Sequence, residues 1–184
     1  MEYFFKYQLL DNDPDEIAKF FYRAKPLDRT QMRYYLKTHP EILDSLIELQ
    51  DFGNQTLPNA LRQFFTILEA PNKHDQYLHL MVEKFSQRFA TCNSSSSLST
   101  SSSYNSGGSI MRNHTPETIY ILCFSLIMLS VDLCNPHIKN KMSKREFIRN
   151  TRRAIRVMDD ELYGHLYDDI YLRGHIAWSS RRKK

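Results

Sequence analysis

Residues 126–136 read LIMLSVDLCNP, a run of large apolar side chains that stops at Asp132 and is followed at once by Asn135 and Pro136. The uncharged apolar segment that contains this run extends from residue 118 to residue 131 and is 14 residues long. A helix needs about 20 such residues to cross a bilayer. The segment therefore predicts a helix buried inside a soluble domain, followed by an irregular loop from Asp132 to Met142 where the chain reaches the surface.

The composition favours one all-α domain over the whole chain, residues 1–184. The 184 residues are 41% hydrophobic, which is enough for a single continuous core. Glycine is scarce, and no stretch alternates apolar and polar residues as a half-buried strand does. Cys92, Cys123 and Cys134 are too few and too irregularly spaced for a disulfide framework, which predicts a cytoplasmic protein.

Capping residues and apolar spacing predict the positions of eight helices. Asp13 before Pro14, Asp28 three residues before Gln31, Thr115 before Pro116, and Ser143 three residues before Glu146 are typical helix starts. The expected helices cover residues 14–24, 29–38, 40–52, 58–70, 75–92, 116–131, 144–158 and 160–172. In the last two, Phe147, Ile148, Thr151, Ala154, Ile155, Met158, Leu162, Tyr163, Leu166, Tyr167, Ile170 and Tyr171 have the spacing of core positions.

Two segments interrupt or end this pattern. Residues 94–109 contain ten serines in sixteen positions, which predicts a disordered loop within the domain. Residues 177–184 form a basic tail whose last four side chains account for the whole net charge of +4; without them, basic and acidic residues balance at 21 each. The chain therefore lacks the domain-wide basic face of nucleic-acid-binding proteins, and the tail offers at most a weak membrane contact.

The predicted 144–158 helix has a strongly basic side, formed by Arg145, Arg149, Arg152, Arg153 and Arg156. This side is interpreted either as a solvated face paired with acids or as a grip for phosphates or an acidic partner. No phosphate-binding loop, dinucleotide fingerprint, zinc-protease motif or serine nucleophile motif is present. Cys134 and His137 have a spacing that zinc can use, but no second ligand pair completes the site. We therefore expect no cofactor and no metal.

Residues 124–148, FSLIMLSVDLCNPHIKNKMSKREFI, resemble the Sec7 domain, an all-α family that catalyses nucleotide exchange on Arf-family small GTPases. The likeness rests on SVDLCN at 130–135, Lys141-Met142 and Phe147-Ile148, together with LPNALRQFF at 57–65 and KFSQRF at 84–89 in the family's order. It covers roughly residues 13–176 apart from the serine-rich insertion. The resemblance implies a multi-helix right-handed superhelix.

Four further segments look closest to the branch of this family in which a Sec7 domain is joined to an F-box. They are DNDPDEIAKF, LPNALRQFF, KNKMSKREFIRNTRRA and GHLYDDIYLRGHI. No F-box is present in the 184 residues, so this likeness implies either a fragment or a stand-alone relative. An F-box outside the chain would connect it to the ubiquitin-ligase machinery.

The resemblance also implies a site. In the family, the end of the apolar helix and the following loop line a groove for the switch regions of the GTPase, with Asp132 and Asn135 as polar contacts. The corresponding residues are Phe124, Met128, Ser130, Val131, Asp132, Cys134, Asn135, Lys141 and Met142. Family exchange further depends on a glutamate in a Pro-Gly-Glu turn, whose charge repels the β-phosphate and competes for Mg²⁺.

That turn corresponds here to APNKHDQ, residues 70–76, and no glutamate stands at its tip. Alignment from Pro71 places Lys73 at the glutamate position, alignment from Phe85 places His74 there, and Asp75 is the nearest carboxylate. Three interpretations follow. The chain is an Arf exchange factor, a non-catalytic Arf-binding adaptor or substrate receptor, or a helical scaffold without a GTPase partner; the residues at 73–75 favour the second. Arf binding would allow recruitment from the cytoplasm to membranes.

Overall fold

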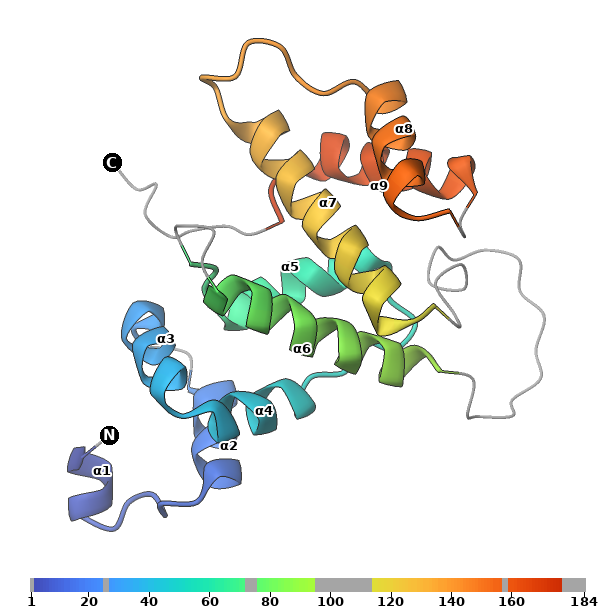
Figure 1. The fold of residues 1–184 in the computed structure, drawn as a ribbon. Coiled ribbons are helices and arrows are strands. Elements are labelled where there is room, and N and C mark those ends of the chain that lie inside the picture. Colours follow the sequence, from blue (N-terminus) through green and yellow to red (C-terminus); the bar gives the residue numbers. More distant parts are fainter. Residues whose placement is uncertain (1, 25–26, 72–75, 95–113, 157–158, 177–184) are drawn as a thin grey trace.

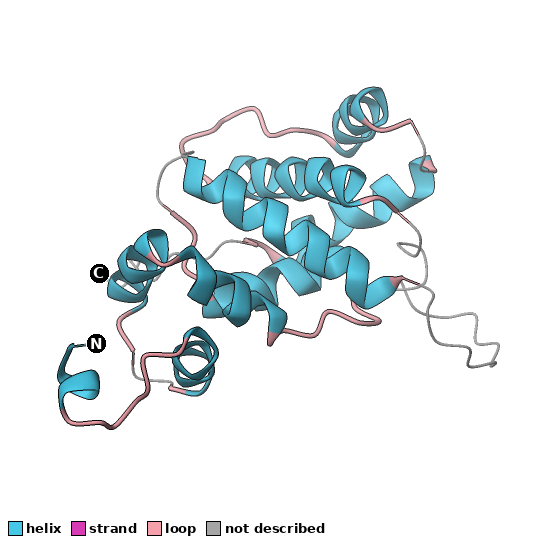
Figure 2. Ribbon diagram, turned by 60° about the horizontal axis from the view of Figure 1, so that its bottom comes forward, coloured by secondary structure: helices cyan, strands magenta, loops and turns pink. Residues whose placement is uncertain are grey.

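The computed structural model describes residues 2–24, 27–71, 76–94, 114–156 and 159–176 (Figure 1). Within these ranges the secondary structure is helical, and no strand occurs (Figure 2). The all-α prediction is confirmed. The helices are α1 (Glu2–Lys6), α2 (Pro14–Arg23), α3 (Arg29–Thr38), α4 (Pro40–Glu48), α5 (Leu57–Ile67), α6 (Gln76–Asn93), α7 (Pro116–Cys134), α8 (Lys144–Ala154) and α9 (Asp160–Arg173).

The apolar helix predicted from the opening stretch is α7, and it occupies the middle of the molecule. Helices α1–α4 lie at one end in Figure 1, α8 and α9 lie at the other, and α7 crosses between them. It packs against α5, α6, α8 and α9. By length and composition α7 could also cross a membrane, but the core helix of a soluble protein passes the same test. Its buried residues are Ile119, Leu122, Cys123, Leu126, Ile127, Leu129 and Ser130.

The predicted helix starts are confirmed at the level of individual hydrogen bonds. The Asp13 carboxylate accepts from the Glu16 backbone N–H at 3.1 Å, and the Asp28 carboxylate accepts from two N–H groups at the start of α3. Ser143 and Glu146 form a reciprocal capping box at the start of α8. Each bond satisfies a backbone group that a helix end would otherwise leave unpaired.

Several helix limits differ from the predictions. Helix α1 is absent from the predictions because its five residues are too short to show an apolar period. Helix α4 ends at Glu48 instead of continuing to Gly53. Helix α8 ends at Ala154 instead of residue 158, where Ile155 turns to an extended conformation and its N–H bonds the Thr151 carbonyl. The prediction of Ala154 as a core position is wrong, because its side chain is exposed.

The core joins the helices through aromatic rings. Phe52, Phe64 and Phe85 are fully buried, and the Phe85 ring lies 4.9 Å from that of Phe52 and 5.1 Å from that of Phe64, centroid to centroid. At the other end of the molecule the buried Tyr163 hydroxyl donates to the Ile155 carbonyl at 2.6 Å. The prediction of Tyr171 as a core residue is wrong, since this side chain is 67% exposed.

Some predictions fall on residues that the structure does not describe. These are the serine-rich segment except Ser94, the basic tail 177–184, the core position Met158, and the turn residues Lys73, His74 and Asp75. They remain predictions.

Candidate functional site: a partner-binding surface on α7

One side of α7 presents large apolar side chains to solvent. Ile121, Met128 and Val131 are 36%, 51% and 40% exposed, and Phe124 between them is half-buried. Their spacing of three, four and seven residues puts all four on one side of a helix. We call these four residues the α7 stripe. Its length, from Ile121 to Val131, is about 15 Å at 1.5 Å per residue.

The beginning of α6 supports the middle of the α7 stripe. The His79 ring stacks on the Phe124 ring with the centroids 4.7 Å apart, and its Nδ1 lies 2.7 Å from the Tyr120 hydroxyl. Next to Ile121, a surface hollow of about 510 Å³ is lined by residues of both α6 and α7, including Glu83 and Glu117. The helix start holds the pKa of Glu117 below its usual value, because backbone N–H and Thr115 bond its carboxylate.

The loop from Asn135 to Ser143, which we call the α7–α8 loop, is closed at its far end by Asp132. The Asp132 Oδ2 accepts a hydrogen bond from the Met142 backbone N–H at 2.7 Å. Asp132 itself lies inside α7, which continues to Cys134, so the predicted start of the irregular loop at Asp132 is three residues early. An acid near a helix C-terminus gains nothing from the helix dipole. Its bond to Met142 provides the compensating interaction.

Lys141 fixes the loop from the opposite side. Its Nζ donates to the Asp132 carbonyl at 2.6 Å and also to the Asn135 carbonyl. These carbonyls belong to the last turn and the C-cap of α7, where a cation is favoured by the helix dipole. The Asn135 side chain in turn accepts from the His137 N–H at 3.0 Å. The loop is therefore held to the end of α7 by bonds at both of its ends.

Helix α9 also contacts the α7–α8 loop. The Tyr167 hydroxyl donates to the Met142 carbonyl at 2.9 Å, and the exposed Tyr171 ring stacks on that of Tyr167 at 6.2 Å. Partial burial raises the pKa of Tyr167, and the nearby Asp132 adds to this effect. The phenol thus keeps its proton, which the bond to Met142 requires.

The segment that leads into the turn at residues 72–75 is anchored to α3. Glu69 is 4% exposed, and its Oε2 accepts from the Thr30 hydroxyl at 3.0 Å and from Arg33 at 3.3 Å. The same Arg33 Nη1 donates to the Ala70 carbonyl. Because the Glu69 carboxylate is buried and bonded to Thr30 and Arg33, it cannot serve as a free carboxylate at the turn.

The structure brings most of the predicted groove residues together. Phe124, Met128, Val131 and Asp132 share the exposed side of α7, and Lys141 and Met142 return to them from the end of the loop. Cys134 and Asn135 form the partly buried end of the helix. Ser130 lies apart from the groove, because it is fully buried and its hydroxyl donates to the Ile127 carbonyl.

Three residues of this surface were missed by sequence reasoning. Ile121 lies seven residues before Met128, so helical spacing could have placed it on the same side. His79 and Tyr171 come from other helices, and no local pattern connects them to α7. Among the residues that the structure describes, no group of three His, Cys, Asp or Glu side chains could hold a metal ion.

Comparison with known proteins gives a family match over nearly the whole chain. The model of the Sec7 domain matches residues 1–173. The chain is 46% identical to human F-box only protein 8 over 179 residues, which cover 96% of this chain and 52% of that protein. The chain thus spans about half the length of this relative.

A second relative and a solved structure extend the comparison. The chain is 33% identical to the ADP-ribosylation factor guanine nucleotide-exchange factor sec72 of Schizosaccharomyces pombe over 172 residues, or 90% of this chain and 8% of that protein. A Sec7 domain in complex with ARF1-GDP and brefeldin A superposes with a TM-score of 0.74 at 19% identity, covering 92% of this chain and 80% of that one. This likeness shows the fold.

Proposed function

The chain belongs to the Sec7 domain family, and from this premise we propose that it binds an Arf-family small GTPase through the α7 stripe and the α7–α8 loop. We further propose that it regulates Arf signalling without accelerating nucleotide exchange. Arf stands for ADP-ribosylation factor. The name of the relative sec72 describes it as a guanine nucleotide-exchange factor for this protein.

The observation that carries the binding proposal is the exposure of the α7 stripe. Met128 and Val131 are 51% and 40% exposed on a helix whose opposite side is the core of the molecule. Apolar side chains gathered on one rigid helix are typical anchors of protein interfaces. The loop beside them is held by Asp132, Lys141 and Tyr167, so its polar backbone groups are arranged before a partner arrives. Such preorganisation lowers the entropic cost of binding.

The absence of exchange follows from charge. Exchange by the family's mechanism needs a carboxylate against the β-phosphate, and Lys73 or His74 occupies that place in the sequence. A cation attracts phosphate and would hold the nucleotide rather than expel it. Glu69 is the nearest described carboxylate before the turn, and it is buried against Arg33 and Thr30.

An adaptor function is a more specific form of the same proposal. The likeness to F-box only protein 8 covers 96% of this chain, and that protein's name includes an F-box. In such an arrangement the Arf-binding module would present its GTPase to ubiquitin-ligase machinery bound elsewhere. A chimaera tests this, with this chain replacing the matched half of F-box only protein 8. Co-precipitation of an Arf protein with F-box partners supports it, and recovery of the F-box partners alone contradicts it.

Two assays test binding and exchange separately. The purified chain is titrated with an Arf protein loaded with GDP, loaded with GTP, and freed of nucleotide. It is then mixed with Arf carrying a fluorescent GDP, and the release rate is followed. We expect binding in at least one nucleotide state and a release rate equal to or below the spontaneous rate. Accelerated release would refute the non-catalytic part, and no binding in any state would refute the whole.

A further inference from the structure

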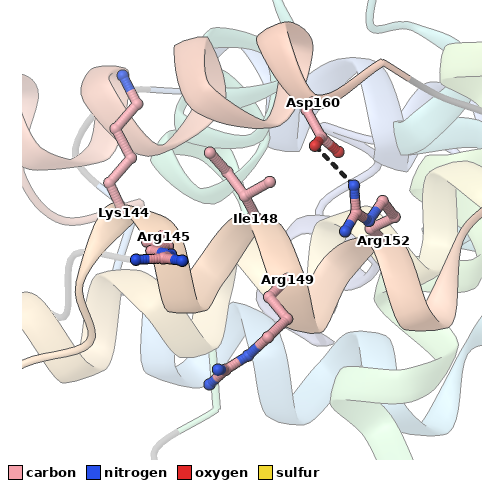
Figure 3. A pocket seen from close by; sticks show the side chains of 6 residues that line it. All are labelled: Lys144, Arg145, Ile148, Arg149, Arg152 and Asp160. Carbon is pink, nitrogen blue, oxygen red and sulfur yellow. Dashed lines mark hydrogen bonds and ion pairs between the residues drawn. The ribbon is translucent and has the colours of Figure 1, made fainter.

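The basic side of α8 is a second surface, separate from the α7 stripe. A hollow of about 630 Å³ lies along α8, from Lys144 to Arg152, and beside the start of α9. It is lined by Lys144, Arg145, Ile148, Arg149, Arg152 and Asp160. Figure 3 shows Ile148 at its centre, the Arg152–Asp160 ion pair at one end and Lys144 at the other, with the guanidinium groups of Arg145 and Arg149 directed away from Asp160.

Acidic neighbours neutralise only part of this charge. Arg152 pairs with Asp160 at 2.8 Å, and Lys144 pairs with Asp168 at 2.6 Å. Glu146 accepts from the Ser143 backbone and hydroxyl, and Arg149 acts on it only as a weaker electrostatic neighbour. Within the described ranges, Arg145, Arg153 and Arg156 are exposed and have no ion pair within 4.0 Å. A net positive surface therefore remains after all local pairs are formed.

The geometry of these cations fits phosphate groups. Arg145 and Arg149 are four residues apart, so they stand about 6 Å apart along the helix, the rise of one turn. A guanidinium group forks onto two phosphate oxygens, whereas a lysine ammonium acts as a point charge. Four of the five basic residues of α8 are arginines, Arg145, Arg149, Arg152 and Arg153, and the fifth is Lys144. The arginine fork fits carboxylate oxygens as well as phosphate oxygens, so the choice between a lipid phosphate and an acidic peptide depends on the rest of the surface.

The same side of α8 lacks the anchors that a protein partner uses. No large apolar side chain is exposed between Lys144 and Ala154, a stretch the structure describes in full. Protein interfaces depend on buried aromatic or aliphatic anchors, but adsorption to an anionic bilayer needs only cations near the surface. We propose that Arg145, Arg149 and Arg153 on α8, with the adjoining hollow, dock the chain on the phosphate groups of anionic membrane lipids.

Vesicle sedimentation with the full 184-residue chain tests this proposal without any GTPase. One set of vesicles contains phosphatidylcholine alone, and the other also contains a phosphatidylinositol bisphosphate. The wild-type chain should bind only the second set, and binding should weaken as salt is raised. Absence of binding to the anionic vesicles would overturn the proposal.

A matched pair of variants separates this surface from general charge. Arg145→Gln/Arg149→Gln should weaken vesicle binding roughly 30-fold, from about tenfold per 1.4 kcal/mol and about 1 kcal/mol per basic residue at a membrane. Lys6→Gln/Arg23→Gln removes the same charge from exposed positions on α1 and α2 and should leave binding close to wild type. Both variants keep the tail at 177–184. Equal losses in the two variants would overturn the proposal.

Two competitors identify the source of the anion. Free inorganic triphosphate should compete weakly, because it lacks the many headgroups of a bilayer. Poly-glutamate should not be retained by the wild-type chain. If the chain does not bind anionic vesicles but binds triphosphate, the surface takes a soluble phosphate and the membrane assignment is overturned. If it binds poly-glutamate but not the vesicles, the surface takes an acidic protein, and the membrane assignment is again overturned.

Discussion

The Asp132 carboxylate and the Met142 backbone amide, ten residues apart in sequence, meet at 2.7 Å and close the α7–α8 loop. This hydrogen bond compensates for the unfavourable position of an acid in the last turn of the apolar helix α7. The Asp132 side chain thus holds the α7–α8 loop, which is itself part of the proposed interface. Asp132 therefore affects a partner mainly through the position of the loop.

Asp132→Ala should free the Met142 N–H and loosen the loop while leaving the helices folded. A single hydrogen bond contributes about 1 kcal/mol, which corresponds to a fall in Tm of about 2–4 °C in a domain of this size. Amide hydrogen exchange should show faster exchange at Met142, and Arf affinity should fall. Asp132→Asn keeps an acceptor and is the control. Unchanged exchange at Met142 in the alanine variant would contradict this account of the loop.

Arg33→Ala should destabilise the chain by about 3–5 kcal/mol, because it leaves the Glu69 carboxylate buried without its cation. Urea unfolding measures the change. The double variant Arg33→Met/Glu69→Leu removes both charges and should recover most of the lost stability. If the double variant is no more stable than Arg33→Ala, the cost does not come from the uncompensated Glu69 charge.

Ser143→Ala should shorten or fray the start of α8, because it removes the hydroxyl from the capping box with Glu146. Hydrogen bonds from the Ser143 backbone and hydroxyl hold the pKa of Glu146 below its ordinary value of about 4.5. A lowered pKa stabilises the fold above the unfolded-state value, and this stability is lost as the pH falls through the folded-state value. Thermal unfolding should thus show a gap between wild type and variant at neutral pH that narrows below about pH 4.5. A gap that stays constant down to acid would rule out the Glu146 contribution.

The sequence predicted the helices well where side chains cap them, because a cap is a local hydrogen bond between residues two or three apart. Asp13, Asp28, Thr115 and Ser143 all cap as expected. Helix ends were less predictable. Helix α8 could have continued on its apolar period, but the chain must turn so that Asp159 caps α9 and Tyr163 reaches the Ile155 carbonyl.

Tyr171 shows why spacing alone misplaces a side chain. Its position in the period of α9 matches the buried Tyr167, but Lys144, the first residue of α8, pairs with Asp168. Tyr171 lies almost one turn beyond that point, where α8 no longer covers α9. Burial depends on where the neighbouring helix begins, and that information is not local.

The position of the candidate site could be predicted from the sequence, but the hydrogen bonds within it could not. The residues of α7 that face outward follow from helical spacing and from the family resemblance. The contacts of Lys141 with two carbonyls and of Asp132 with a backbone N–H were not predictable, because they join side chains to backbone groups across a loop. Ser130 fits the family motif by position, yet it is turned to the core.

Lys73→Glu and His74→Glu should convert the chain toward an exchange factor if either residue occupies the place of the family's glutamate. Each restores a negative charge at the turn, so the variant with the correct alignment should accelerate GDP release from Arf. We expect partial rescue, since a misplacement of about 1 Å can cost about 10²-fold in rate. Asp75→Asn is the control and should leave the slow release of the unmutated chain unchanged. Robust release by the unmutated chain that Asp75→Asn abolishes would instead assign the function to Asp75.

The most direct measurement of the central claim is the affinity of Arf for the chain with a charge placed in the α7 stripe. Met128→Asp puts a carboxylate in the middle of the proposed interface, while Leu49→Asp places the same charge at an exposed position at the end of α4. Calorimetric titration with the Arf nucleotide state that binds best should show at least a tenfold loss for Met128→Asp, typical of an interface anchor that costs more than about 1.4 kcal/mol. Leu49→Asp should bind like the wild type. Wild-type affinity in a folded Met128→Asp variant would contradict the claim that Arf binds on α7.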